Sequence, residues 1–124
     1  MARTVTFDQV RKLALALPGA EEGTMYGGVA FRVGGHMFAC QPTHRSAEPN
    51  SLVVRIDFDE RDELLRIEPD TYYITDHYVG YASILVRLSR VHPDAISGLL
   101  RTAYNFVGAK PKPRPSSKKR QTKR

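Results

Sequence analysis

The sequence predicts an α+β fold in which N- and C-terminal helices cover one face of a single antiparallel sheet of about five strands. Apolar residues at helical spacing lie near both ends of the chain, and runs of β-branched and aromatic residues with period-two alternation lie between them. Strands bracketed by terminal helices are typical of α+β proteins. The 124 residues suit one domain. No apolar run approaches the roughly 20 residues that cross a bilayer.

Helical spacing marks both ends of the predicted domain. Thr6 and Gln9 stand three residues apart, as in a capping box that opens a helix. The apolar residues of this first helix are Phe7, Val10, Leu13, Ala14 and Leu17. The last helix begins at Pro93 or Asp94 and closes at Gly108. Its apolar stripe consists of Ile96, Leu99, Leu100, Ala103, Tyr104 and Val107.

A short helix is expected between the strands, with Asp59 as its N-cap and Leu64, Leu65 and Ile67 buried. Its first turn is rich in carboxylates, which suit the positive end of a helix. The spacing of these carboxylates does not match a calcium loop, so we expect no metal site here. The five predicted strands cover residues 29–33, 36–40, 51–56, 72–75 and 83–88.

Turn residues connect these strands. Gly34–Gly35 lies between two apolar runs and predicts a two-residue hairpin, and Gly27–Gly28 is interpreted as a turn in the same way. Residues 72–88 predict a second hairpin, in the middle of the sheet, whose corner carries most of the chemically varied side chains. Residues 41–50 are polar, contain two prolines and predict a long mobile loop.

The alternation along three strands places one arginine each on the sheet face away from the helices. Arg32, Arg55 and Arg87 are out of phase with apolar neighbours such as Val54, Ile56, Ile84 and Val86. Guanidinium groups on this outer face can contact phosphates, with aromatic side chains of the corner stacking on an unpaired base. An outer face that is merely solvated is the alternative, since antiparallel sheets often have one wet side.

The net charge of +6 is concentrated at the C-terminus. Residues 1–109 carry 11 basic and 13 acidic side chains, a net charge near −2, and form the predicted domain. Residues 110–124 hold eight cations and no acid, which predicts a disordered basic tail. These cations are Lys110, Lys112, Arg114, Lys118, Lys119, Arg120, Lys123 and Arg124.

Three stretches of the chain resemble a known family. LALALPGAEEGTMYGGVAFRVGGHMFA, SLVVRIDFDERDELL and YYITDHYVGYASILVRL occur in the order seen in the MmcQ/YjbR family of small bacterial proteins. The resemblance implies a fold similar to CyaY and frataxin. It also implies DNA binding through hairpins arranged as a double wing, and in many relatives a lysine stands at the position of His36.

From these observations we expect a non-enzymatic protein that binds DNA without sequence preference, through the tail and the outer sheet face. The candidate contacts in the domain are Arg32, His36, Arg55, Arg87, His77, Tyr78 and Tyr81. The tail contributes Lys110, Lys112, Arg114, Lys118, Lys119 and Arg120. The alternative is a protein-interaction or small-ligand-binding module that uses the open sheet face.

Catalytic, metal and cofactor sites are not expected. The four histidines are scattered without ligand spacing, and Asp76, His77 and Ser83 lack a nucleophile elbow or an oxyanion loop. Cys40 is the one cysteine of the chain and is interpreted as a small buried strand residue. The N-terminus lacks an apolar signal segment, so we expect a cytoplasmic monomer that does not bind membranes.

Overall fold

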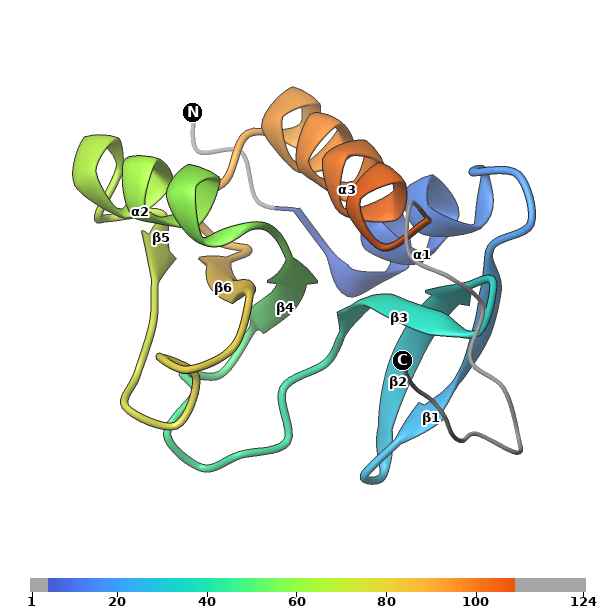
Figure 1. Cartoon of the computed structure of the whole chain (residues 1–124), viewed down its shortest axis with the longest axis horizontal. Helices are drawn as coiled ribbons and strands as arrows, with labels where there is room; N and C mark the ends of the chain where they lie inside the picture. Colours follow the sequence, from blue (N-terminus) through green and yellow to red (C-terminus); the bar gives the residue numbers. More distant parts are fainter. Residues whose placement is uncertain (1–4, 109–124) are drawn as a thin grey trace, which may run out of the picture.

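The computed structural model describes residues 5–108, and within them one antiparallel sheet carries three helices (Figure 1). The strands lie in the order β1-β2-β3-β4-β6-β5. This arrangement confirms the α+β class and the single sheet. The elements are α1 (Phe7–Leu15), β1 (Glu21–Met25), β2 (Gly28–Val33), β3 (His36–Cys40), β4 (Ser51–Arg55), α2 (Phe58–Ile67), β5 (Tyr72–Tyr73), β6 (Ser83–Arg87) and α3 (Pro93–Gly108).

Strand β1 is the sixth strand, beyond the five predicted from the sequence. Its residues are mostly polar, so local pattern does not reveal it, and it forms because a tight turn pairs all five of its residues with β2. The turn residues are Tyr26 and Gly27, with φ of +53° and +85°, as in the type I′ turns that connect hairpins. The turn is therefore one residue earlier than Gly27–Gly28, and Gly28 belongs to β2. The hairpin at Gly34–Gly35 is confirmed.

The hairpin that contains β5 and β6 lies at an edge of the sheet rather than in its middle. β6 pairs with β4 over five residues, whereas β5 has only Tyr72 and Tyr73 paired with β6 and ends before Ile74. The middle of the sheet is instead the junction of β3 and β4. This junction is short, with two paired positions, Ala39 with Val54 and Cys40 with Val53.

Helices α1 and α3 cover one face of the sheet and α2 lies beside β5 and β6. The capping box at Thr6 and Gln9 is present, and the predicted apolar stripe of α3 faces the sheet. Helix α2 begins two residues earlier than expected, because Asp57 rather than Asp59 accepts the N-cap hydrogen bond. Ile67 is half exposed rather than buried. None of the three helices is long and apolar enough to span a membrane.

The predicted strand phases are confirmed. Val54, Ile56, Ile84 and Val86 are buried against the helices, in the main core. Arg55 and Arg87 are partly exposed on the other face. The register between β2 and β3 shifts after Phe31, so that β3 contains a bulge at Phe38, and both Phe38 and Ala39 reach the main core.

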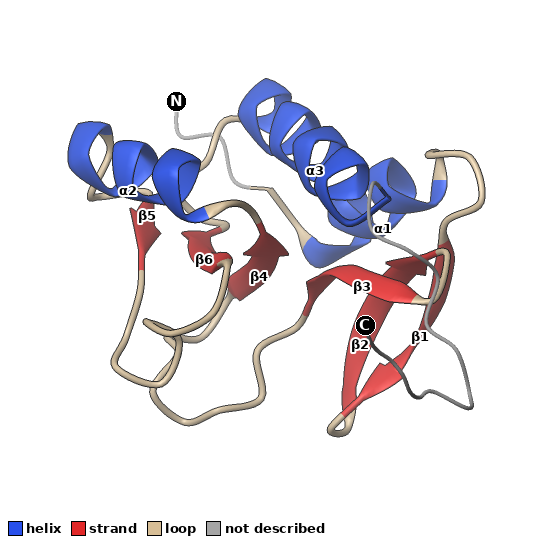
Figure 2. Ribbon diagram, viewed as in Figure 1, coloured by secondary structure: helices blue, strands red, loops and turns tan. Residues whose placement is uncertain are grey.

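The outer face of the sheet is not merely solvated. It carries a second apolar cluster made of Ala30, Cys40, Val53, Tyr78 and Leu85. Loop 41–50 and loop 74–82 lie on this side, opposite α1 and α3 (Figure 2). The tail predicted at residues 110–124 is outside the residues that the structure describes.

Candidate functional site: a pocket on the outer face of the sheet

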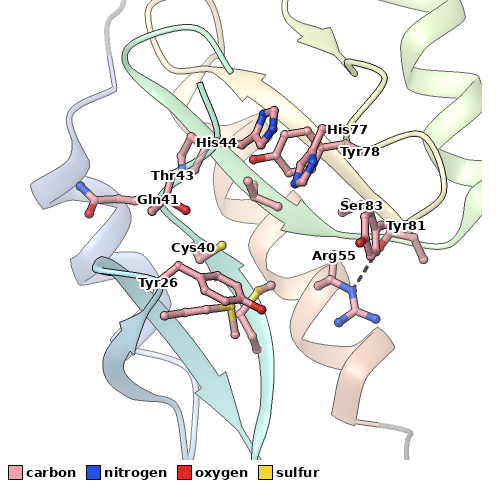
Figure 3. Close-up of a pocket in the computed structure, with 15 residues that line it drawn as sticks. Tyr26, Cys40, Gln41, Thr43, His44, Arg55, His77, Tyr78, Tyr81 and Ser83 are labelled. Carbon is pink, nitrogen blue, oxygen red and sulfur yellow. Dashed lines mark hydrogen bonds between the residues drawn. The ribbon is translucent and has the colours of Figure 1, made fainter. Parts of the chain in front are cut away.

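A pocket of about 610 Å³ opens on the outer face, between the β1–β2 turn and the two loops (Figure 3). Its volume is within the range of small-molecule sites. The floor lies over the short β3–β4 junction, where Cys40 and Val53 pair. Because of the bulge at Phe38, Met37 is on the same face as Cys40 and also lines the pocket.

One wall is the start of loop 41–50, which runs close against β2. The Gln41 N–H donates to the Val29 carbonyl at 2.8 Å, and the Val29 N–H donates to the Gln41 side chain at 3.0 Å. A Cβ at Gly28 would lie 2.9 Å from Cγ2 of Thr43 and 3.3 Å from the backbone oxygen of Gln41, so this close approach favours glycine at position 28. The absence of a side chain at Gly28 therefore allows the start of loop 41–50 to pack directly against β2.

A stacked pair of imidazoles joins the two loops at the rim. The rings of His44 and His77 are 3.7 Å apart with an interplanar angle of 9°. The Ser46 N–H donates to Nδ1 of His44 at 3.1 Å, which requires that nitrogen to be unprotonated. Partial desolvation, His77 and Arg45 lower the pKa of His44 below 6.5. The neutral form of His44 is therefore favoured. The Ser46 hydroxyl also hydrogen-bonds Thr75 at 2.7 Å.

The opposite wall, the corner of residues 76–82, is held by a buried arginine from α2. The Arg61 guanidinium donates to the carbonyls of Val79 and Tyr81 at 3.0 Å each, and it lies over the ring of Phe58. These bonds fix the backbone beside Tyr81, whose side chain is 60% exposed at the pocket mouth. Tyr78 is buried in the outer cluster and contributes to the pocket lining.

Arg55 supplies the cationic group of the pocket. Its Nε donates to the Ala82 carbonyl at 3.2 Å, and it pairs across the ladder with Ser83, which also lines the pocket. Within residues 5–108 its guanidinium forms no ion pair with a carboxylate. The pocket lining contains no Asp or Glu, so Arg55 gives this site a net positive character.

The other predicted contacts are separated from the pocket. Both carboxylate oxygens of Glu48 accept hydrogen bonds from Arg87, whose Nη1 also donates to the carbonyls of Pro69 and Asp70. Arg87 therefore has a structural role in joining loop 41–50 to β6. Arg32 donates to the Thr24 carbonyl on the outer face but does not line the pocket.

His36 is also away from the pocket. It pairs with Val33, which packs against the main core, so His36 is on the helix side of the sheet. The tail cations are outside the described residues. The structure thus brings together four of the predicted side chains, namely Arg55, His77, Tyr78 and Tyr81.

Cys40 is a buried thiol on the floor of the pocket. It is 8% exposed, and burial raises its pKa from 9.0 to about 11 although Arg32 and Arg55 act in the opposite direction. A thiol with this pKa is protonated at neutral pH and is a poor nucleophile. Within the described part of the chain, no group of three or more His, Cys, Asp or Glu side chains is placed to hold a metal ion.

Two important residues were not found by sequence reasoning. Tyr26 lines the pocket from the β1–β2 turn, although tyrosine is uncommon in the left-handed conformation that it adopts. An aromatic residue before a turn glycine is the signal that could have indicated it. Arg61 was not singled out in the sequence, because its burial depends on a corner 18 residues further along the chain.

The fold and the pocket define a small α+β domain with a pocket that opens on the sheet face away from its covering helices. The YjbR family model matches residues 15–106, most of the chain, and the protein therefore belongs to the YjbR family.

The solved structures similar to this chain include the crystal structure of Deinococcus radiodurans protein DR2400, described with the domain DUF419. The TM-score is 0.71 with 24% identity, over 86% of this chain and 81% of that chain. At this identity the likeness concerns the fold alone. No curated protein matches the sequence at a significant level. The predicted similarity of the fold to CyaY and frataxin stays a prediction.

Proposed function

We propose that this YjbR domain is a non-enzymatic DNA-binding protein that prefers unpaired strands and has no sequence preference. The observation that carries the proposal is the pocket on the outer face, where aromatic side chains surround an arginine without a carboxylate partner in residues 5–108. Aromatic platforms beside cations are the usual means of binding single strands. The basic segment 110–124 would supply the attraction to phosphates.

The charge distribution supports separate contributions of the tail and the domain to DNA binding. Residues 1–109 have a net charge near −2, so the domain alone is expected to be repelled by a polyphosphate except around Arg55. The tail would therefore provide most of the affinity, and the pocket would position one unpaired residue of the strand. Arg87 is not part of this interface because it is paired with Glu48, and His36 is not part of it because it is on the helix side of the sheet.

The absence of an enzymatic role is part of the proposal. The two pocket histidines stack on each other, and no carboxylate lines the pocket to orient either of them as a base. The thiol of Cys40 is protonated at neutral pH. These features argue against general-base or thiolate catalysis in this pocket.

A second function, binding of a free small molecule, is favoured by the size of the pocket. A volume of about 610 Å³ suits a compact ligand, and the lining combines several rings, two methionines and one cation. The protein could bind such a ligand without any contribution from the tail.

The test compares the full chain with a chain ending at residue 109. Binding of a fluorescent single-stranded oligonucleotide and of the matching duplex is measured at several salt concentrations. We expect the full chain to prefer the single strand, and its log affinity to fall linearly with log salt. Deleting the tail should remove most of the affinity and flatten the slope, by about 0.7 for each phosphate that the shortened chain no longer neutralises.

The control is circular dichroism of the shortened chain, which should melt as the full chain does because no core residue of the domain is removed. Unchanged affinity and slope after deletion would move the interaction wholly to the sheet face. If neither chain binds DNA, the proposal is wrong and the small-molecule function is favoured.

A further inference from the structure

Tyr26 is placed in the structure in a way that packing does not explain. Its side chain is 89% exposed, so it adds little to the core, yet its φ of +53° is one that tyrosine rarely adopts. Unfavourable backbone conformations of this kind are concentrated at ligand sites. Tyr26 lines the mouth of the pocket, and this position suggests a role in binding.

A second exposed ring stands across the pocket. Figure 3 shows Tyr26 at one side of the pocket and Tyr81 at the other. Tyr26 and Tyr81, here called the jaws, come from the β1–β2 turn and from the corner of residues 76–82. Because both rings are largely exposed, a planar aromatic ligand could cover their faces and remove apolar surface from water.

The polar groups near the jaws indicate that the ligand carries an anionic group. Arg55 lies beside Tyr81, its Nε bound to the Ala82 carbonyl while its terminal nitrogens point away from that bond (Figure 3). A guanidinium next to an aromatic slot suits an anion attached to the ring system, because phosphates and carboxylates accept two parallel hydrogen bonds. With no carboxylate in the lining, an anionic ligand meets no repulsion there.

We infer that the pocket binds a single nucleotide, with the base held between the jaws Tyr26 and Tyr81 and the phosphate on Arg55. The nucleotide is either free in solution or an unpaired residue of a strand, since both present the same base and phosphate. In the second form the inference deepens the proposed DNA binding and rests on it. If the nucleotide is free in solution, the inference does not depend on the proposed DNA binding.

The turn at Tyr26 permits a test in which loss of binding cannot be attributed to unfolding. Tyr26→Asn removes the ring and creates Asn-Gly, the pair that this turn type favours, so the hairpin should be kept or strengthened. Tyr26→Phe keeps the ring. Arg55→Gln removes the charge in the pocket, and Arg101→Gln removes an equal charge from the exposed side of α3 as a matched control.

The chain contains three methionines, two of which, Met25 and Met37, line the pocket. Labelling the full chain with methyl-¹³C methionine therefore places two NMR probes in the site. Deoxyadenosine monophosphate, deoxyadenosine, inorganic phosphate and a single-stranded oligodeoxyadenylate are titrated separately. A base between the jaws should shift both signals through its ring current.

We expect the monophosphate to shift both signals saturably, with binding about tenfold weaker in Tyr26→Asn and within about twofold of normal in Tyr26→Phe, as removal of one stacking ring predicts. Arg55→Gln should bind the monophosphate no better than deoxyadenosine, and Arg101→Gln should behave as the unchanged chain. Shifts with the oligonucleotide alone, weakened by Tyr26→Asn, would support the inference and identify a strand as the source.

Two results would overturn the inference. One is that neither the monophosphate at millimolar concentration nor the oligonucleotide moves the methionine signals, even if the tail binds DNA in the salt titration. The other is that the shifts are equally strong in Tyr26→Asn and Arg55→Gln. If the monophosphate binds as expected while DNA does not bind in that titration, the inference stands and the proposed function fails.

Discussion

Cys40 illustrates how the outer apolar cluster controls the chemistry of a single residue. Its thiol is buried over the β3–β4 junction, and desolvation raises its pKa although Arg32 and Arg55 favour the thiolate. Burial is therefore the stronger effect at this position. A small apolar side chain was predicted at Cys40, and the structure agrees with that interpretation.

The raised pKa of Cys40 predicts a stability change at alkaline pH. The folded thiol ionises at about 11 and the unfolded thiol near 9.0, so the favourable contribution is complete below pH 9 and is lost as the pH rises through 11. Urea unfolding at pH 8 and pH 10.5 should show a larger loss of stability for the natural chain than for Cys40→Ala, by at most about 2–3 kcal/mol.

Reaction of the same thiol with iodoacetamide provides the control. It should be slow at pH 8 in the folded chain and fast in urea, because folding both buries and protonates the thiol. Rapid reaction of the folded chain at pH 8, or an identical pH dependence of stability in Cys40→Ala, would contradict the prediction.

Helix α2 contributes to the candidate site through one side chain rather than through its apolar stripe. Arg61 reaches from the helix to two carbonyls of the corner that contains Tyr81. Its side chain is 8% exposed, so its bonds are screened little by water. α2 therefore acts as the support of one pocket wall.

We expect Arg61→Met to destabilise the domain by about 2 kcal/mol, because it removes the charged donor of two hydrogen bonds to the carbonyls of Val79 and Tyr81. The matched control is Arg66→Met on the same helix, whose exposed ion pair with Glu63 is worth less than about 1 kcal/mol. Urea unfolding measures both variants, and amide exchange of residues 79–81 should become faster only in Arg61→Met. Equal effects of the two substitutions would contradict this role of Arg61.

Some elements of the fold could be predicted from the sequence and others could not. The alternation around Val54 and Val86 predicts which face each residue takes, because a strand buried on one side leaves a period of two in its sequence. Gly34–Gly35 likewise predicts its hairpin, since few other residues accept two positive φ angles in succession. These features depend on neighbours along the chain.

Features that depend on distant segments were missed. The pairing of β4 with β6 joins residues such as Val53 and Leu85, and no local pattern indicates that neighbourhood. The pocket combines Tyr26, Arg55 and Tyr81, which are far apart in sequence, so only Arg55 and Tyr81 could be proposed, each for its own strand or corner. The buried state of Arg61 is unpredictable for the same reason.

At the scale of the whole molecule, charge is distributed unevenly along the chain. The eight cations of residues 110–124 reverse the sign of a protein whose remaining 109 residues are slightly acidic. Under the proposed function, the outer face attracts an anion locally through Arg55, although residues 1–109 are slightly acidic. The salt titration of the two chain lengths distinguishes the contribution of each part.

The polar character of β1, which hid this strand from sequence analysis, has a further consequence for self-assembly. The free side of an outermost strand exposes unpaired amides and carbonyls to which another molecule can add a strand. β1 carries exposed Glu21, Glu22 and Thr24, and the other outermost strand, β5, is only two residues long beside α2. Both borders of the sheet are therefore poor templates for intermolecular pairing.

We expect the natural chain to remain monomeric in light scattering as its concentration rises. The double variant Glu21→Val, Thr24→Val makes β1 apolar while leaving the ion pair between Glu22 and Arg11 intact, and its average mass should rise with concentration. A variant that stays monomeric would show that the charge on β1 is not what prevents aggregation. On this view, the polar side chains of Glu21 and Thr24 keep the folded protein from polymerising through its sheet.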